Sequence, residues 1–341
     1  PIIFPNKSLN SKLRFGIIGC SRIAESSVIP AILTSKHAEL EMIGSRNIKK
    51  SKQFANKFKC NKFGNYDDVL ENENVDIVYI STPVGLHEKW SVLSAKKGKH
   101  ILCEKSSTHS FESAKKMVLI SKKNNVRLME SLMFRFHPQH KKVQELIKKN
   151  YLGKLFTFSG FYGFPPIPKT DIRFNKKLGG GILNDAGCYP ICASRILFSE
   201  EPESVFCNLV IDKKSKVDTK ANLFLKYSRI KSAFMSVGYD VSYRSTYGLW
   251  GTKGNLSLKR AYNIPGNMSA KIIINTNKTN TISIKPVNHF SLIIDNFSKV
   301  LQGIIKSSFN FEDDLLKQAR IMEAARKSSQ TKKEIKIKDI K

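Results

Sequence analysis

The sequence predicts a parallel α/β sheet that is followed by a larger, mostly antiparallel sheet. Over residues 14–130, short apolar runs alternate with helical patterns, which is the signature of a parallel sheet with crossover helices. From Phe156 to about Ile284, β-branched and aromatic runs recur between polar turns, as in antiparallel strands. A length of 341 residues allows each sheet a hydrophobic core of its own.

In the first region, apolar runs predict the strands and the periodic segments between them predict the helices. The predicted strands are Arg14–Gly19, Leu40–Ser45, Asp76–Ser81, His100–Cys103 and Val126–Glu130. The predicted helices lie near Ile23–Ser35, Ile48–Phe58, His87–Lys97 and Phe111–Asn124. Pro30 falls inside the first of these helices and is expected to bend it. Crossover connections place helices on both faces of such a sheet.

The second region begins with a helix at Pro138–Lys149, and Gly153 then marks the change to β-rich sequence. A further helix, Asp185–Phe198, follows a turn of three glycines, and two more helices are expected near Phe290–Ile305 and Phe311–Ser328. The predicted strands include Ser204–Ile211, Ala221–Tyr227, Ser232–Tyr239, Thr246–Trp250 and Lys271–Ile274. We expect an open sheet with helices on one face. The expected domains are 1–132 and 133–341, with a final helix over 311–329 that is able to pack back on the first.

Composition excludes several classes of protein. No apolar run is long enough to span a bilayer, and residues 1–10 lack the apolar core of a secretion signal, so we expect a cytoplasmic protein. The net charge of +30 comes from dispersed lysines, without a basic arm or a zinc-finger spacing, so we expect neither nucleic-acid nor membrane partners. The positive field favours an anionic cofactor or substrate.

The six cysteines are scattered, which predicts free thiols rather than disulfides. Cys188 and Cys192 share a helical face at a spacing of four residues. We interpret this pair as ordinary packing and expect no metal.

A glycine turn follows the first predicted strand and leads into a helix, which is how a dinucleotide's phosphates are delivered to a helix N-terminus. Gly19 holds the first position of the fingerprint, while Ser21 and Ala24 hold the positions of its second and third glycines. The Ser21 hydroxyl is expected to donate to a phosphate. The predicted cofactor contacts here are Gly19, Cys20, Ser21, Arg22 and Ile23.

The end of the second strand distinguishes NADP from NAD. An NAD enzyme usually has an acidic residue there for the ribose diol, whereas this chain has Ser45 and Arg46, and its Glu39 and Glu41 lie near the other end of the strand. Serine can donate a hydrogen bond to a 2′-phosphate and arginine can pair with it. We therefore predict NADP(H) rather than NAD(H), the alternative being an exposed arginine at a helix start.

A third contact region follows the buried strand that ends at Ser81. Open α/β sheets bind ligands at the carboxyl ends of their strands, so Thr82 and Pro83 are predicted cofactor contacts. His87 is included with them, although a histidine at a helix start can equally be structural.

Together these segments resemble the Gfo/Idh/MocA oxidoreductase family, over about residues 12–330. The resemblance depends on four landmarks in the expected order. They are the glycine turn, Thr82-Pro83 with Leu86-His87, Cys103-Glu104-Lys105, and Gly179-Gly180-Gly181 with the segment that continues to Tyr189. The segment Met129–Pro138 resembles the branch of dimeric dihydrodiol dehydrogenases and sugar ketoreductases.

The resemblance implies roles for the last two landmarks. It places Lys105 beside the nicotinamide as a catalytic or substrate-orienting residue, while Glu104 positions the loop. In the family a proline usually follows this lysine, whereas this chain has Ser106. The resemblance therefore does not fix the backbone conformation of this loop. Asp185 and Tyr189 are four residues apart and would share a helical face, and many relatives have histidine at the position of Tyr189.

The expected chemistry is hydride transfer coupled to proton transfer at a carbonyl or hydroxyl oxygen. A tyrosine with a pKa near ~10 becomes a useful acid or base beside a lysine cation, which favours its phenolate. Tyr189 is therefore predicted to donate the proton in reduction, Lys105 to polarise the oxygen, and Asp185 to orient the substrate or Lys105. The alternative is that Asp185 caps a helix and Tyr189 is a buried packing residue.

Weaker substrate candidates lie after the first sheet and before the glycine-rich turn. They are Arg135, His137, Tyr162 and Arg173, with Asp171 beside the last. The predicted function is that of an NADP-dependent oxidoreductase acting on a sugar or polyol, possible substrates including nucleotide-linked keto sugars. The alternatives are a trans-dihydrodiol or pentose dehydrogenase and a non-catalytic NADP-binding sensor or assembly partner. The resemblance implies a homodimer or homotetramer, which we expect to form through the second sheet.

Overall fold

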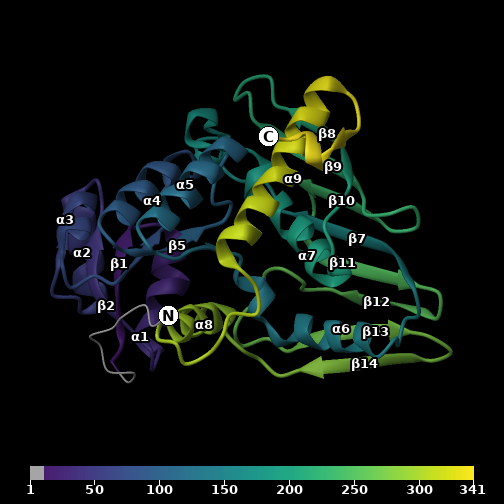
Figure 1. The fold of residues 1–341 in the computed structure, drawn as a ribbon, viewed down its shortest axis with the longest axis horizontal. Helices are drawn as coiled ribbons and strands as arrows, with labels where there is room; N and C mark the ends of the chain where they lie inside the picture. Colours follow the sequence, from purple (N-terminus) through teal and green to yellow (C-terminus); the bar gives the residue numbers. More distant parts are fainter. Residues whose placement is uncertain (1–10) are drawn as a thin grey trace. The chain divides into compact units, whose positions relative to one another are not determined.

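The structure is a computed structural model that describes residues 11–341, and the expectation about a secretion signal concerns residues outside this range. The chain divides into two compact units (Figure 1). The first comprises residues 11–108, Glu112–Met133 and His289–Leu316. The second comprises His109–Phe111, Phe134–Asn288 and Lys317–Lys341. The functional division that we expected at residue 132 remains a prediction.

The first unit is built on a six-stranded parallel sheet, which confirms the predicted fold class of the N-terminal region. The strand order is β3-β2-β1-β4-β5-β6, so the direction of winding reverses between β1 and β4. Such a switch point is where open α/β sheets bind ligands. The strands are β1 (Leu13–Ile18), β2 (Ala38–Gly44), β3 (Phe63–Gly64), β4 (Ile77–Ile80), β5 (His100–Glu104) and β6 (Leu128–Ser131).

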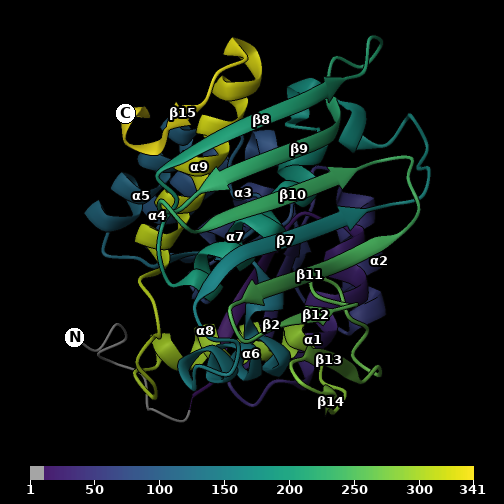
Figure 2. The same cartoon turned by 90° about the vertical axis from the view of Figure 1, so that its right-hand side faces the viewer.

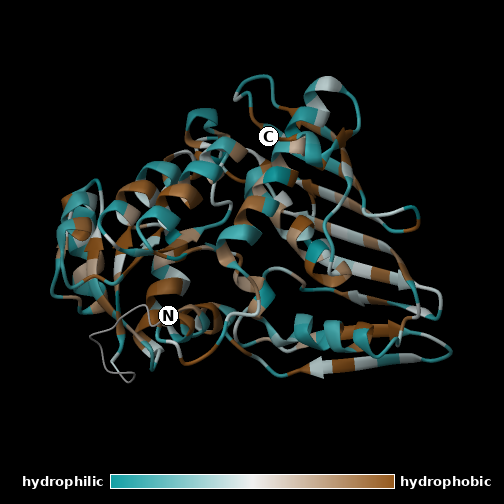
Figure 3. Cartoon of the chain, in the orientation of Figure 1, coloured by the Kyte–Doolittle hydropathy of each residue, from teal (hydrophilic) through white to brown (hydrophobic). Residues whose placement is uncertain are grey.

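Helices connect these strands. All residues of β4 and β5 are buried, as expected for strands covered on both faces. In Figure 3, α5 carries both hydrophobic and hydrophilic residues, and its buried side chains include Phe111, Met117 and Val118. The helices that lie wholly within this unit are α1 (Ile29–Thr34), α2 (Ile48–Phe58), α3 (Tyr66–Glu71), α4 (His87–Lys96) and α8 (His289–Leu301). Helix α5 spans Phe111–Lys123.

The first helical segment contains a feature that the sequence analysis did not anticipate. A π-helical turn, η1 (Ala24–Val28), precedes α1, and Pro30 occupies the second residue of α1. Proline cannot donate a backbone hydrogen bond, and π turns commonly occur where the regular hydrogen-bond pattern is interrupted. The expected bend at Pro30 therefore takes the form of a wider turn just before it.

The second unit is built on a nine-stranded sheet of order β14-β13-β12-β11-β7-β10-β9-β8-β15. Every pairing is antiparallel except that of β7 with β10, which confirms the predicted mostly antiparallel architecture. The longer strands are β7 (Leu155–Gly163), β8 (Ser204–Ile211), β9 (Asp218–Lys226), β10 (Ser232–Gly238) and β11 (Arg244–Gly251). The others are β12 (Gly254–Leu258), β13 (Ala270–Asn275), β14 (Thr279–Ile284) and β15 (Ile335–Lys336).

Helices cover one face of this sheet. Helix α7 (Cys188–Phe198) packs on β7 and β10, and α6 (Pro138–Lys148) packs on β13. Helix α9 (Phe311–Thr331) reaches β8, where the Ser328 hydroxyl accepts a hydrogen bond from the backbone N–H of Cys207. Figure 2 shows the opposite face, with β8, β9, β10, β7 and β11 side by side in the foreground and α7 behind them.

No helix within residues 11–341 is long and apolar enough to cross a membrane.

Candidate active site

Gly19 directly follows β1 and has a backbone conformation that suits glycine. Its φ is +110°, and a Cβ at this position would lie 3.0 Å from the carbonyl carbon of Ser81. The backbone N–H of Gly19 also donates to Gly44 O at 3.1 Å, so the turn lies between the ends of β2 and β4. The glycine leaves open the space that a Cβ would fill, as the first glycine of a dinucleotide fingerprint does.

The Ser21 hydroxyl stabilises this turn. It donates to Ser81 Oγ at 2.9 Å and accepts from the backbone N–H of Ala24 at 3.1 Å, while Ser81 Oγ donates to Gly19 O at 2.8 Å. A hydroxyl has one proton to donate, and here Ser81 receives it. The phosphate contact that we expected of Ser21 stays a prediction.

Two arginines flank the turn without ion pairs to other described residues. Arg22 follows it and Arg46 follows β2, and both are exposed. Buried Ser45 accepts a hydrogen bond from the backbone N–H of Asn47 at 3.2 Å. Burial raises the pKa of the neighbouring Cys20 thiol to about 11. This end of the sheet therefore offers positive charge and a neutral thiol.

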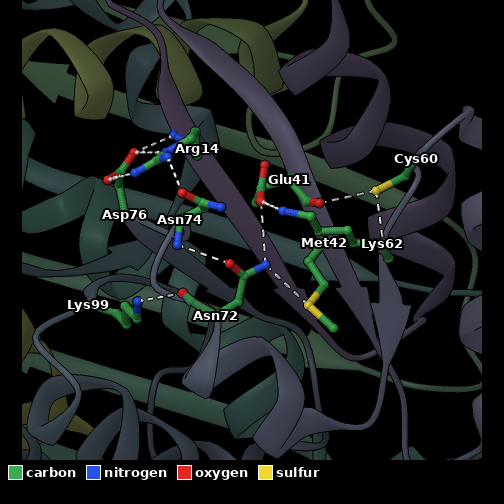
Figure 4. Close-up of polar contacts among 9 residues, drawn as sticks. All are labelled: Arg14, Glu41, Met42, Cys60, Lys62, Asn72, Asn74, Asp76 and Lys99. Carbon is green, nitrogen blue, oxygen red and sulfur yellow. Dashed lines mark hydrogen bonds and ion pairs between the residues drawn. The ribbon is translucent and has the colours of Figure 1, made fainter.

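The Glu41 carboxylate of β2 lies away from Arg46, as the sequence predicted. Figure 4 shows Glu41 in an ion pair with Lys62 near the amino end of the sheet, where Arg14 pairs with Asp76. Glu25, after the glycine turn, pairs with Lys57 at 2.7 Å. The end of β2 that carries Arg46 is thus free of the acid that an NAD diol would need, and its cations fit a 2′-phosphate.

Thr82 and His87 lie where the third contact region was predicted. The buried Thr82 Oγ1 has no hydrogen-bond partner within the described part of the chain, which suits a ligand contact. Pro83 beside it is half-buried. The buried His87 ring has Nε2 2.7 Å from Thr82 O and Nδ1 3.0 Å from Ser106 O. His87 therefore connects two loops, in agreement with the structural alternative for this residue.

Lys105 follows β5 on a loop whose neighbours are buried. Glu104 accepts a hydrogen bond from Tyr79 Oη at 2.7 Å and another from the backbone N–H of Lys105 at 3.3 Å. Burial raises the pKa of Glu104, against which the hydrogen bond from Tyr79 and the charge of Lys105 act. The Lys105–Ser106 peptide bond is cis, although residue 106 is serine. Glu104 thus connects β4 to the backbone of Lys105, and its role in positioning the loop stays a prediction.

The second glycine turn is fixed by an aspartate that the sequence analysis missed. Gly181 has a φ of +121°, and a Cβ there would collide with the carboxylate of Asp218 in β9. Asp218 accepts a hydrogen bond from the backbone N–H of Leu183 at 2.6 Å, at the start of the next helical segment. Asp218 thus caps this segment from a distant strand, and no local pattern around Gly181 signals it.

Asp185 lies in a π-helical turn, η6 (Leu183–Gly187), that precedes α7. It accepts hydrogen bonds from Arg173 Nε at 2.6 Å and from Tyr239 Oη at 3.2 Å. Arg173 also donates to Asp171 at 3.2 Å. Asp185 is therefore held by two side chains rather than serving as a helix cap, and the π turn alters the α-helical spacing from which we expected it to share a face with Tyr189.

Tyr189 lies at the second residue of α7 within an aromatic cluster. Its ring centroid is 5.1 Å from that of Tyr162, 5.6 Å from Phe134 and 5.7 Å from Tyr262. The residue is 4% exposed. These ring contacts fix the orientation of the Tyr189 side chain. They are compatible both with the predicted catalytic role and with the alternative of a buried packing residue.

The other substrate candidates have different surroundings. Tyr162 packs directly on Tyr189, and Arg173 binds Asp185. Arg135 is half-buried in the short helix η3 (Met133–Phe136). His137 is buried and accepts a hydrogen bond from the backbone N–H of Gln139 at 3.3 Å, which caps α6. Burial lowers the pKa of His137 to about 4.

No group of residues suited to a metal ion occurs within residues 11–341. Cys188 and Cys192 are buried, and neither forms a disulfide within the described residues.

Comparison with known proteins covers both units. A model described as "Oxidoreductase family, NAD-binding Rossmann fold" matches residues 13–132, and one described as "GFO/IDH/MocA C-terminal domain" matches residues 140–257. The chain is 31% identical over 266 residues to a dTDP-3,4-didehydro-2,6-dideoxy-alpha-D-glucose 3-reductase of Saccharopolyspora spinosa, covering 78% of this chain and 80% of that protein. It is 30% identical to an NADP(+)-type D-xylose 1-dehydrogenase of Haloferax volcanii, covering 85% and 89%.

A similar solved structure is that of a 3-ketoreductase from Actinomadura kijaniata in complex with NADP and TDP-benzene. It has a TM-score of 0.89 and 28% identity, and the match covers 93% of this chain and 98% of that one. Its lysine-to-alanine and tyrosine-to-phenylalanine variants have also been solved with the same ligands. The two substituted positions are separated by the same number of residues as Lys105 and Tyr189.

Proposed function

Because this chain belongs to the Gfo/Idh/MocA oxidoreductase family, we propose that it uses NADPH to reduce a keto group on a nucleotide-linked sugar. The observation that carries this proposal is that Lys105 and Tyr189 have the same separation in sequence as the lysine and tyrosine substituted in the A. kijaniata ketoreductase. A second reductase of a dTDP-linked keto sugar, from A. kijaniata, matches over 94% of this chain.

The first unit provides the groups that would hold the cofactor. The backbone of residues 19–23, at the start of a helical segment, suits the pyrophosphate. Ser45 and Arg46, with Arg22, suit the 2′-phosphate, and Thr82 with Pro83 suits the part nearer the nicotinamide. NADPH supplies the hydride when it is bound. The two arginines without ion pairs favour NADP(H) over NAD(H).

Proton transfer is assigned to Tyr189. Its phenol donates the proton that the reduced oxygen needs, and the ammonium of Lys105 stabilises negative charge on that oxygen and on the phenolate that remains. Asp185 is fixed by Arg173 and Tyr239, so its carboxylate is oriented to accept a hydrogen bond from a sugar hydroxyl. Tyr189 acts as the base when the reaction runs towards oxidation.

Charge supports an anionic substrate. Lys176 and Lys177 are exposed directly before the second glycine turn and form no ion pair with other residues of the described chain. Together with the net charge of +30 they favour a substrate that carries a diphosphate. A pentose dehydrogenase, as in the H. volcanii relative, or a trans-dihydrodiol dehydrogenase would use the same acid–base pair on an uncharged substrate.

We also propose that two copies associate through the open face of the nine-stranded sheet. Phe206, Phe224 and Phe234 lie directly opposite one another on β8, β9 and β10. Trp250 on β11 is 57% exposed and packs on Phe156 at 5.0 Å between ring centroids. Exposed aromatic residues grouped on one face are typical of an association surface.

Protein-dependent loss of NADPH absorbance is the experiment that tests the function. The panel contains dTDP-linked keto sugars, free keto sugars, diketones and, with NADP⁺, xylose and a trans-dihydrodiol. We expect turnover with a nucleotide-linked keto sugar and at least about 10-fold lower kcat/KM with the free sugar. Turnover with xylose or the dihydrodiol alone would replace the substrate assignment. Tight NADPH binding without turnover on any substrate would favour the sensor alternative, and absence of NADP(H) binding would contradict the proposal.

A further inference from the structure

A single peptide group in the loop of Lys105 is bound at both its polar atoms by buried ionisable side chains. The carbonyl oxygen of Ser106 lies 3.0 Å from Nδ1 of His87, at the start of α4. The N–H of Ser107, which belongs to the same peptide group, donates to Oε1 of Glu130 in β6 at 2.7 Å. His87 and Glu130 are 43 positions apart in sequence, yet they hold the two sides of one amide plane.

Both ring nitrogens of His87 lie within hydrogen-bond distance of carbonyl oxygens. Its Nε2 lies 2.7 Å from Thr82 O and its Nδ1 lies 3.0 Å from Ser106 O. Carbonyl oxygens only accept hydrogen bonds, and a neutral imidazole donates from only one nitrogen. Both contacts are hydrogen bonds only when the ring is an imidazolium.

A buried imidazolium needs a compensating negative charge, because burial of an isolated charge is costly. His87 is 1% exposed and Glu130 is 7% exposed. The carboxylate of Glu130 accepts from the amide whose carbonyl accepts from the ring, so the peptide links the two charges. Hydrogen bonds of this kind polarise one another in a low-dielectric interior.

The other ionisable groups nearby have partners of their own. Glu88, next to His87 on α4, binds Lys116 and Ser113 of α5 at 2.6 Å each. Glu104 of β5 binds Tyr79, and Lys105 lies on the loop itself. Burial raises the pKa of Cys103 well above its usual value, which keeps this thiol neutral beside Glu130 and Glu104. Glu130 is therefore the carboxylate that the loop connects to His87.

We propose that His87 and Glu130 are positioning residues, which hold the Ser106–Ser107 peptide in an imidazolium–peptide–carboxylate bridge and so fix the backbone that carries Lys105. The inference rests on the proposed function, in which Lys105 acts on the substrate oxygen. Lys105 is only one residue from the clamped peptide, and Glu104 holds its backbone N–H from the other side. A small displacement of such a group lowers the rate far more than it lowers binding.

Nitrogen NMR of the imidazole ring tests the bridge without any substrate. The full chain is labelled with ¹⁵N-histidine, and the His87 signals are assigned by their absence from His87→Gln. At pH 7.5 we expect both His87 nitrogens to resonate as protonated nitrogens. In Glu130→Gln, which keeps the shape of the side chain but removes its charge, we expect one nitrogen to become pyridine-like. The matched control is Glu88→Gln, which removes a carboxylate adjacent to His87 that binds Lys116 and Ser113 of α5.

Kinetics test the positioning role. In Glu130→Gln we expect kcat to fall about 10- to 100-fold while the dissociation constant for NADPH changes by less than about 2-fold. Glu88→Gln is expected to retain kcat within about 2-fold. His87→Phe keeps a ring of similar size but has no hydrogen-bond donors. Like Glu130→Gln, it is expected to lower kcat with little change in the dissociation constant for NADPH.

The outcomes separate this inference from the proposed function. A pyridine-like His87 nitrogen in the unsubstituted protein overturns the bridge, whatever the activity. An unchanged His87 signal in Glu130→Gln overturns the link between the two residues. Imidazolium signals in a protein that turns over no substrate leave the bridge in place and contradict only the proposed function. Equal losses of kcat in Glu130→Gln and Glu88→Gln overturn the positioning role.

Discussion

The two glycine turns share a backbone plan but are held by different chemistry. Each has a glycine of positive φ that leads into a π turn and then an α-helix with proline among its first three residues. The first turn is held by neutral groups, namely the hydroxyls of Ser21 and Ser81 and the carbonyl of Gly19. The second is held by carboxylates, with Asp218 on the backbone and Asp185 on Arg173.

The first turn is therefore suited to binding an anion, whereas the second turn fixes the carboxylate of Asp185. Because the first turn needs no charge to hold its shape, Arg22 and Arg46 remain exposed and without ion pairs inside the described range. At the second turn, Arg173 is used to hold Asp185. An anion can therefore approach the first turn without breaking an ion pair, whereas Asp185 is oriented before any ligand arrives.

The largest effect is expected from removing the proposed proton donor on α7, the helix that follows the second turn. Tyr189→Phe removes the proposed proton donor and should lower kcat about 10³-fold, within the range for general acid catalysis. The dissociation constant for NADPH should stay within about 2-fold. The matched control is Tyr227→Phe, which removes a buried hydroxyl that hydrogen bonds to Ser194 on the same helix. Steady-state kinetics and fluorescence titration measure the two quantities, and similar kcat values for the two variants would contradict the assignment.

Alanine at the glycines compares the turns directly. Gly181→Ala should cost about 3 kcal/mol of unfolding free energy, since it adds an unfavourable φ and displaces the capping Asp218. Gly19→Ala should cost about 2 kcal/mol, because its Cβ presses on the backbone of Ser81. Gly98→Ala is the control, with a φ of +68° but no atom within 4 Å of the added Cβ, and should cost about 1 kcal/mol.

Urea unfolding measures these differences, and the chain has one tryptophan reporter for each unit. Trp90 lies in the first unit and Trp250 in the second. Gly19→Ala is therefore followed in a Trp250→Phe background and Gly181→Ala in a Trp90→Phe background. Equal costs at Gly98 and Gly181 would show that close contacts, as distinct from backbone conformation, contribute nothing at the second turn.

A buried histidine in each unit predicts sensitivity to acid. Burial, with the charge of Arg127, lowers the pKa of His100 to about 4, and burial lowers that of His137 to about 4, from 6.5. In both rings Nδ1 accepts a backbone N–H, at 2.9 Å from Arg127 and 3.3 Å from Gln139, and protonation replaces that acceptor with a donor. A base with a lowered pKa in the fold stabilises it above pH 6.5, and this contribution is lost as pH falls towards 4.

Each histidine should therefore cost about 2 kcal/mol of unfolding free energy between pH 7.5 and pH 5.0. Urea unfolding at the two pH values measures the loss. His100→Gln and His137→Gln should each make it smaller by about that amount in their own unit. The exposed His109→Gln is the control and should leave the pH dependence as it is. A loss confined to one unit would show that the two rings are not equivalent.

The smallest effect is expected at the first turn, where it tests whether Arg46 contacts the 2′-phosphate. Arg46→Ala should weaken NADPH binding about 10-fold, the value of one charge-assisted hydrogen bond, and leave NADH binding within about 2-fold. Isothermal titration with both cofactors measures this. Arg229→Ala, at an exposed position between β9 and β10, serves as the control for loss of surface charge. Equal weakening of NADPH and NADH would place the guanidinium away from the 2′-phosphate.

Local patterns predicted the sheets and the first turn because strand and turn signals lie within a few residues of the structure they specify. The apolar run before Gly19 and the absence of acid after β2 are of this kind. The sequence analysis missed Asp218, Tyr239 and Glu130 because each acts on a segment far from it in the chain. It also read Ile23–Ser35 and Asp185–Phe198 as continuous α-helices, since apolar periodicity does not distinguish a π turn from an α turn.

The first unit is completed by residues near the other end of the chain, and this has a consequence for synthesis on the ribosome. Helix α8 packs on α1, Asp295 binds Ser35, and Glu312 binds Arg127 at 2.9 Å. Translation at about 5–20 residues per second delivers residue 289 roughly 10–30 s after residue 133. Throughout that interval the apolar surface of α1 that α8 will cover stays open to solvent. Nascent chains stalled before residue 289 should therefore be the ones that recruit chaperones.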